Sequence, residues 1–270
     1  MPFTFSHPAA VLPAARTRLV LSALVIGSMA PDFEYFLAPY SRSWHEVPGI
    51  FLYCLPVSFL VLLLFHVVAK WPLLALFPRA WQAKLVRPAR GFRPWPASNL
   101  LPAIVSLALG ILTHVAWDNC THATGWLALH LPVMNRVILQ YHDHYLALYK
   151  AAQHGSTVLG AVVLAVAIAR WYRRTPAAKE PLPPQLSGTA KVMIPVLTVL
   201  IAASAALLQA GFSWDVFFNY SLFRGFLRSA TIAGITAAAA WLLVFSLGWR
   251  IFGRRDPWRE SGDWGSGDSA

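Results

Sequence analysis

Residues 103–122, AIVSLALGILTHVAWDNCTH, begin as an apolar run and end with three side chains that bind metal ions in many proteins. With the residues before it, this run is long enough to cross a bilayer core, which takes about 20 helical residues. Residues i and i+4 share a helix face about 6 Å apart along the axis, so His114 and Asp118 can hold one ion. His122 lies about 12 Å from His114 along an unbroken helix. Either Asp118 bridges two ions, or the helix breaks around 119–125 and His122 folds back.

The composition is that of an integral membrane protein. Of 270 residues, 57% are hydrophobic and only 12% are charged, and the mean hydropathy is +0.53. Backbone groups inside a bilayer are satisfied only in helices or closed barrels, and the apolar runs here are continuous rather than alternating. The sequence therefore predicts an all-α, polytopic membrane helical bundle of about five transmembrane helices, at 48–69, 97–117, 155–172, 191–212 and 229–250.

The N-terminal apolar stretch, 8–30, differs from these spans because it is interrupted by one proline and two arginines, Pro13, Arg16 and Arg18. It favours two short helices over one crossing. We expect a shallow re-entrant or interfacial helical hairpin, which would return His7 and Asp32 to the same face of the membrane. The first residues have neither a basic start nor a small-residue cleavage site, so we expect no removable signal peptide.

The formal charge of +11 comes from 22 basic and 11 acidic residues. In a soluble protein it would suggest nucleic acid. Here the basic residues cluster in 70–93, 170–191 and 250–259, and five spans place all three clusters on one side of the membrane. The positive-inside rule makes that side cytoplasmic, together with the C-terminus. We therefore expect a lipid bilayer and no nucleic acid as partner.

The same pattern divides the chain into four parts. Residues 1–172 form a membrane domain with a metal site, and 173–190 form a Pro-rich cytoplasmic linker. Residues 191–252 form a two-helix membrane hairpin, and 253–270 form a disordered tail.

On this topology, several potential metal ligands converge on the outward face. Imidazoles combined with carboxylates suit Zn²⁺, or Mn²⁺ or Fe. The alternative is an ordinary helix end with interfacial polar residues. The stretch 31–34, PDFE, adds two carboxylates, and His45 stands at another helix start. We predict one or two Zn²⁺ ions, or another divalent metal, held among His7, Asp32, His45, His114, Asp118 and His122. The sequence assigns no role to His142, His144 or His154.

Four stretches carry a family resemblance: MPFTFSHPAAVLP, SALVIGSMAPDFEYF, THVAWDNCTH and QHGSTVLG. They resemble the bacterial membrane family known as domain of unknown function 4184, over nearly the whole chain. The order of His, PD, His and HxxxD is also similar to membrane-bound metal-dependent hydrolases and, more distantly, to the zinc-dependent phospholipase C fold. The resemblance implies a location in the bacterial inner membrane.

Carried over motif by motif, the hydrolase resemblance implies that His45, His114 and Asp118 bind one zinc ion. It implies that Asp118 is shared with a second ion that His7 also holds, and that Asp32 is a ligand or the catalytic base that orients the attacking water. The chain departs from these families in two places. The hydrolase stretch before the helix appears only as SWHEVPG, and the later HxxxE pair of the phospholipase is missing, although YHDHY at 141–145 could supply ligands in its place.

Three functions are compatible with these residues. The first is a membrane-embedded metal-dependent hydrolase acting on a lipid-like phosphoester at the outer membrane face. The second is a non-enzymatic membrane protein in which the His and Asp residues form a structural site. The third, a metal or proton transporter, fits less well because the ionisable groups lie near span ends rather than at mid-membrane.

Overall fold

The computed structural model describes residues 4–37, 43–92, 97–141, 144–179, 182–183, 186–211 and 214–252. The chain is 84% helical, which confirms the predicted all-α class. Five helices are long and apolar enough to cross a membrane, as the hydropathy pattern predicted: Val47–Leu76, Ala97–His130, Leu148–Arg174, Gly188–Gln209 and Ser221–Phe252. The expected tail, 253–270, lies outside the described residues.

The chain forms two compact units. Unit 1 comprises Met1–Leu64 and Phe92–Pro176, and unit 2 comprises Phe65–Gly91 and Ala177–Ala270. The segment 65–91, which the sequence division places with the metal-site domain, therefore packs with the C-terminal helices. The described residues of the expected linker, 173–190, run from the end of one long helix to the start of the next.

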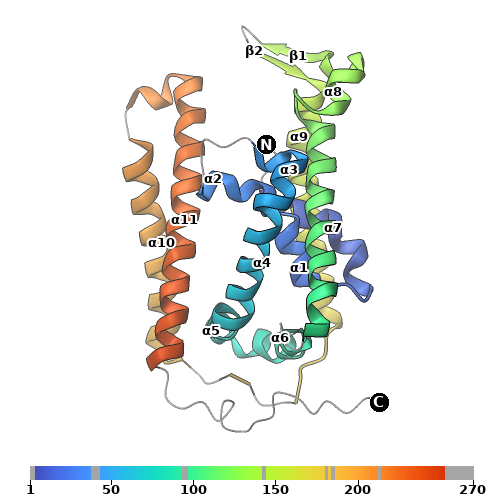
Figure 1. Ribbon diagram of the computed structural model, residues 1–270. Coiled ribbons are helices and arrows are strands. Elements are labelled where there is room, and N and C mark those ends of the chain that lie inside the picture. The colour runs from blue at the N-terminus through green and yellow to red at the C-terminus, as the bar shows by residue number, and fades with distance from the viewer. Residues whose placement is uncertain are drawn as a thin grey trace. The chain divides into compact units, whose positions relative to one another are not determined.

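Unit 1 contains most of the secondary structure (Figure 1). Its 3₁₀ and π segments are η1 (Thr4–Arg16), η2 (Ala30–Phe33), η3 (Ser43–His45), η4 (Ile50–Cys54), η6 (Ala97–Asn99) and η7 (Pro132–Asn135). Its α-helices are α1 (Leu21–Gly27), α2 (Glu34–Leu37), α3 (Val47–Gly49), α4 (Leu55–Leu63), α7 (Leu100–Thr121), α8 (Trp126–His130) and α9 (Leu148–Arg174). Two antiparallel strands, β1 (Val137–Tyr141) and β2 (His144–Ala147), complete it.

The N-terminal hairpin has the two short helices that the sequence predicts. Its first arm, η1, contains Pro8 and Pro13 and is a 3₁₀ helix; proline removes backbone donors and disfavours a regular α-helix. The second arm, α1, lies against α7 (Figure 1). At the turn between the arms, the backbone N–H of Val20 donates to Ser106 Oγ of α7 at 2.9 Å.

Two glycines allow α1 and α7 to touch backbone to backbone. A Cβ on Gly27 would overlap the carbonyl of Leu107, and a Cβ on Gly110 would overlap the Leu24 carbonyl and stand 2.7 Å from Ser28 N. Small residues at such crossings are typical of helix packing in membranes. The contact is flanked by a buried apolar cluster of Ala23, Ile26, Leu62, Ala103 and Leu107.

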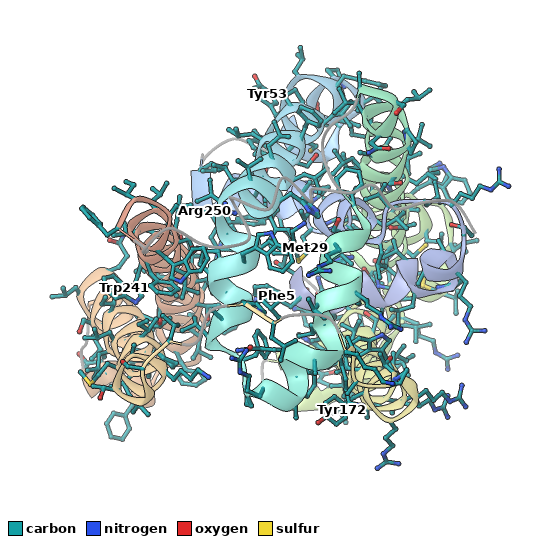
Figure 2. All side chains as sticks on the ribbon, turned by 90° about the horizontal axis from the view of Figure 1, so that it is seen from below. Phe5, Met29, Tyr53, Tyr172, Trp241 and Arg250 are labelled. Atoms are coloured by element: carbon teal, nitrogen blue, oxygen red, sulfur yellow. The ribbon has the colours of Figure 1, made fainter. Side chains whose placement is uncertain are left out.

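The first span begins at Val47, with Glu46 at the N-cap and a proline in the first turn. Its next turn, η4, is a π-helix, in which Leu55 N–H bonds to the Ile50 carbonyl. Cys54 lies at the end of this turn and its thiol donates to the Trp44 carbonyl at 3.1 Å. Trp44 and Cys54 are buried with Ala30 and Ile111, so the chain just before the span is held against the hairpin and α7. Tyr53, in contrast, is exposed (Figure 2).

The segment between the second and third spans is shorter than expected. The predicted spans 97–117 and 155–172 leave residues 118–154 between them, but α9 already begins at Leu148. The strands β1 and β2, which the sequence does not predict, occupy part of the interval. Their stretch is rich in β-branched and aromatic residues, which favour strands over helices.

Unit 2 contains η5 (Leu64–Ala69, of which all but Leu64 lies in this unit), α5 (Lys70–Leu76), α6 (Arg79–Gly91), α10 (Gly188–Ala210), η8 (Trp214–Phe217) and α11 (Tyr220–Phe252). α10 and α11 run side by side (Figure 1). The corner between α5 and α6 is fixed by the buried Gln82, which donates to the carbonyls of Ala75 and Phe77. Arg250 of α11 donates to the carbonyl of Val68 at 3.3 Å (Figure 2).

We predict that Gly110→Ala lowers the thermal stability of the protein. The added methyl group must push α1 and α7 apart, and such overpacking costs about 1–3 kcal/mol. Gly155→Ala is the matched control, because a Cβ at Gly155 of α9 meets no atom within 4 Å, and alanine is the better helix former by up to ~1 kcal/mol. Thermal unfolding in detergent measures both; equal midpoints for Gly110→Ala and the unsubstituted protein would contradict the backbone contact.

Candidate metal centre

Segments far apart in the sequence bring three histidines and three carboxylates together in unit 1. We call this group the His/carboxylate cluster: His7, Asp32, Glu34, His45, His114 and Asp118. His7 comes from η1, and Asp32 and Glu34 come from the end of the hairpin. All members except His45 are buried, and the His45 side chain is 25% exposed.

Four members of the cluster present donor atoms within 4.8 Å of one another: Asp32, His45, His114 and Asp118. His114 Nε2 lies 3.4 Å from Asp118 Oδ2 and 3.6 Å from Asp32 Oδ1. His45 Nε2 lies 3.6 Å and 3.8 Å from the same two oxygens. Two imidazole nitrogens and two carboxylate oxygens therefore face a common centre.

The spacing of these atoms fits a bound ion better than direct hydrogen bonds. Good N–H···O bonds span about 2.7–3.2 Å, and all four separations are longer. Ligands about 2.0–2.1 Å from a tetrahedral zinc ion lie about 3.3 Å apart, close to the separations seen here. In the described part of the chain, His114 Nε2, Asp32 Oδ1 and Asp118 Oδ1 are buried without a hydrogen-bond partner. The cluster could therefore hold a metal ion.

The ring of His114 is oriented as a metal ligand requires. Its Nδ1 lies 2.7 Å from the carbonyl of Ser28, so Nδ1 carries the proton that is donated. In the neutral ring the lone pair is then on Nε2, which faces Asp32 and Asp118. Metal-binding histidines commonly donate their other ring N–H in this way. Ser28 directly follows α1, so the contact between α1 and α7 sets this bond.

Asp32 is held on both sides of its carboxylate. The hydroxyl of Thr4 donates to Asp32 Oδ2 at 2.6 Å, while Oδ1 faces the two histidines. Burial raises the pKa of Asp32 to about 6, against the opposing effect of His114. The carboxylate is therefore still mostly ionised at neutral pH. With one oxygen bonded to Thr4 and the other at the donor group, this geometry favours the ligand role over the base role.

His45 has a carboxylate behind it. Its Nδ1 lies 3.7 Å from Glu34 Oε1, on the side of the ring away from the donor group. Glu34 is itself buried. Burial, with a further contribution from His114, lowers the pKa of His45 to about 4. The ring is therefore neutral at pH 7, and Nε2 can present a lone pair without losing a proton first.

His7 lies on the other side of Asp118. Its ring stacks on His114 with centroids 3.8 Å apart, and its Nε2 lies 3.7 Å from Asp118 Oδ1. Burial and His114 lower the pKa of His7 to about 3, which makes this ring neutral as well. The preceding residue, Ser6, donates to the carbonyl of Thr157 in α9 and so fixes the start of η1.

His122 is next to the cluster but is already bonded. α7 ends at Thr121, and His122 takes an extended conformation at its C-cap. The helix thus breaks at the point where the sequence left this alternative open. His122 Nδ1 bonds to the Asp118 carbonyl at 3.0 Å, and Gln153 Nε2 donates to His122 Nε2 at 3.1 Å. His122 Nδ1 also lies 3.7 Å from Asp118 Oδ1. Neither ring nitrogen of His122 belongs to the four-residue donor group.

Among the described side chains, His130 and His154 do not belong to the four-residue donor group. His130 of α8 stacks on Trp126 and bonds to its carbonyl. His154 lies in α9, and His144 begins β2. His142, with the centre of the YHDHY stretch, lies outside the described residues.

The charges of the donor group also match a divalent cation. Asp32 and Asp118 are two buried carboxylates that face the same centre, and buried charges are costly unless they are compensated. The ion-pair contacts recorded for both carboxylates in the described residues are with histidines. One divalent ion would neutralise the pair.

The sequence comparison places the chain in a family. Residues 1–247 match the family described as Domain of unknown function (DUF4184). The chain belongs to this family. No curated protein and no solved structure matches it. The description of DUF4184 states no activity, and the match gives no support to the hydrolase families that these motifs resemble.

Several contributors were not among the predicted ligands of this DUF4184 chain. Glu34 could have been predicted, because it stands two residues after Asp32 in the PDFE stretch. The spacing of Thr4, the Ser28 carbonyl and Gln153 in the sequence does not reveal their roles. Thr4 and Ser28 bond to cluster members, and Gln153 bonds to the adjacent His122, each through a contact between distant segments.

We predict that the purified protein retains about one or two divalent ions per chain, and that His114→Ala and Asp118→Ala lose them. Each substitution removes one of the four donors, and an incomplete set binds metal far more weakly. His130→Ala is the control, because this exposed histidine lies outside the group. Metal content by mass spectrometry measures the effect; no metal above background in the unsubstituted protein would rule out the site.

We also predict that Glu34→Gln weakens zinc binding by about 10–100-fold without changing the number of ions bound. A carboxylate behind a metal-binding imidazole fixes its orientation and raises its basicity, and its loss typically has this effect. Glu46→Gln is the matched control, since Glu46 is next to His45 in sequence but exposed. Competition with a chromogenic chelator gives the dissociation constants. Equal constants for Glu34→Gln and the unsubstituted protein would assign Glu34 another role.

Proposed function

We propose that this protein is a membrane-embedded, zinc-dependent hydrolase that cleaves a lipid-like phosphoester at the outer membrane face. The observation that carries the proposal is the four-residue donor group of Asp32, His45, His114 and Asp118. Three or four nitrogen and oxygen ligands suit Zn²⁺. A zinc ion in this position would supply Lewis acidity and a water that is nucleophilic at neutral pH.

The two oxygens of Asp118 face different partners, which supports a shared ligand. Oδ2 faces His45 and His114, while Oδ1 faces His7. If one ion is bound, neutral His7 lies beside its ligand Asp118 without binding the ion itself. If two ions are bound, His7 and Asp118 Oδ1 are ligands of the second. The number of ions per chain separates these two arrangements.

The surroundings of His45 favour an amphiphilic substrate. The cluster is most open at His45, whose side chain is 25% exposed, against 0% for His114. Two apolar side chains in the first turns after His45 are exposed, Val47 at 69% and Phe51 at 66%. A lipid whose apolar part contacts these side chains would bring its headgroup to the donor group.

The outward orientation is supported by α9. In its first turns Gln153 bonds to His122, next to the cluster, and its last turn carries Arg173 and Arg174. At 1.5 Å per residue these ends are about 30 Å apart, the thickness of a bilayer core. The positive-inside rule assigns the basic end to the cytoplasm and therefore the cluster to the outer face.

We predict that the zinc-loaded protein hydrolyses phosphoesters of the lipid class and that Asp118→Asn abolishes turnover. The carboxamide keeps the shape of the side chain but removes the negative charge that faces His45 and His114 on one side and His7 on the other. A panel of phospholipids and isoprenoid phosphates in mixed micelles, assayed for released phosphate or headgroup, provides the measurement. His130→Ala should retain full activity. A zinc-replete protein that cleaves no member of the panel would contradict the proposal.

A structural metal site is the second candidate, because Asp32 and His114 are completely buried. A structural ion adds folding free energy and leaves no ligand position for water. In that case removal of the metal by a chelator should strongly lower the midpoint of thermal unfolding. The metal-loaded protein should cleave no ester. Hydrolysis that disappears on chelation and returns with zinc identifies the catalytic site instead.

A further inference from the structure

The turn of the N-terminal hairpin lies at the surface of unit 1, on the side away from the His/carboxylate cluster. Both ends of the hairpin are at the cluster, because His7 and Asp32 each contact its other members. Between them, Val20 bonds to Ser106, which precedes His114 by eight residues in α7. Eight helical residues correspond to about 12 Å. The turn therefore reaches well into the span and towards the opposite leaflet.

The length of the first arm supports this depth. η1 has 13 residues, and a 3₁₀ helix rises about 2.0 Å per residue, which gives roughly 26 Å. The arm starts against Thr157 and Gly160 of α9 and packs along that helix. α9 continues to its basic last turn, so the hairpin turn and the basic end of α9 belong to the same half of the bilayer.

Two arginines stand at this turn. Arg16 ends η1 and Arg18 follows two residues later, and both are exposed. The turn is ordered by Thr17, whose hydroxyl donates to the Ala14 carbonyl and accepts from Leu19 N–H. In the described ranges no hydrogen bond or ion pair is recorded for either guanidinium.

An exposed arginine on a hairpin that enters the bilayer needs an anion. Its guanidinium stays charged at any physiological pH, and a charge in hydrocarbon is strongly disfavoured. Long basic side chains therefore extend to the nearest headgroups. The guanidinium groups of Arg16 and Arg18 stand on one short turn, and each can bind two oxygens of a phosphate group.

We propose that the hairpin turn of Arg16 and Arg18 is a binding site for the phosphate of an anionic phospholipid in the leaflet opposite the His/carboxylate cluster. The lipid would hold the turn in place from outside, as Ser106 does from inside. This site is separate from the donor group, so it does not depend on the proposed hydrolase activity.

The test uses the full chain in nanodiscs of phosphatidylcholine mixed with phosphatidylglycerol. Native mass spectrometry counts the phosphatidylglycerol retained and gives an apparent affinity. Arg16→Gln combined with Arg18→Gln should weaken it roughly 30-fold, since each arginine near a membrane surface contributes about 1 kcal/mol. The control, Arg136→Gln, removes an exposed arginine just before β1 and should bind as the unsubstituted protein does. Inorganic phosphate should not compete, because the ligand is a lipid.

Equal retention by the double Gln variant and the unsubstituted protein would overturn the proposal. If the double Gln variant does not fold, the Arg16→Lys and Arg18→Lys pair replaces it. This pair keeps both charges but cannot form bidentate bonds, so several-fold weaker retention is expected and unchanged retention overturns the proposal.

Discussion

The backbone contact between α1 and α7 is the constraint on which the candidate site depends. Gly27 and Gly110 let the two helices approach until each touches the other's carbonyl groups. Only at this separation does the Ser28 carbonyl reach His114 Nδ1. The same contact places Asp32, four residues further along, beside His114 Nε2. The close packing of α1 and α7 is thus also what positions the ligands.

The second constraint is electrostatic. Burial keeps His7 and His45 neutral, with pKa values of about 3 and 4, so these two rings cannot balance the carboxylates as cations. His45 instead presents Nε2 towards the centre that Asp32 and Asp118 face. A divalent ion would neutralise the negative charge of the carboxylates and would coordinate the donor atoms that have no hydrogen-bond partner. This shared solution is why a metal explains the cluster more simply than a network of hydrogen bonds.

Hydropathy and helical spacing were sufficient for much of this picture. The five spans follow from run length, and His114 with Asp118 follows from the i, i+4 relation. The hairpin was predictable because Pro13 and two arginines prevent a single crossing. The bonding of His122 to Gln153 was not predictable, since it joins two helices that the sequence does not orient. The early start of α9 was missed because Tyr149, Lys150 and Gln153 make its first turns polar, and hydropathy detects only the buried or lipid-facing part of a helix.

The π-helical turn η4 makes the site sensitive to helix geometry as well as to residue type. A π-turn holds about one more residue than an α-turn, and Ile50–Cys54 places that extra residue between His45 and the rest of the span. If the same five residues formed a regular α-helix, what precedes them would rotate by about 100° relative to the span. His45 would then leave the donor group although every ligand remained in the sequence. Among DUF4184 members, substitutions that replace this π-turn by a regular α-helix would therefore move a ligand without touching it.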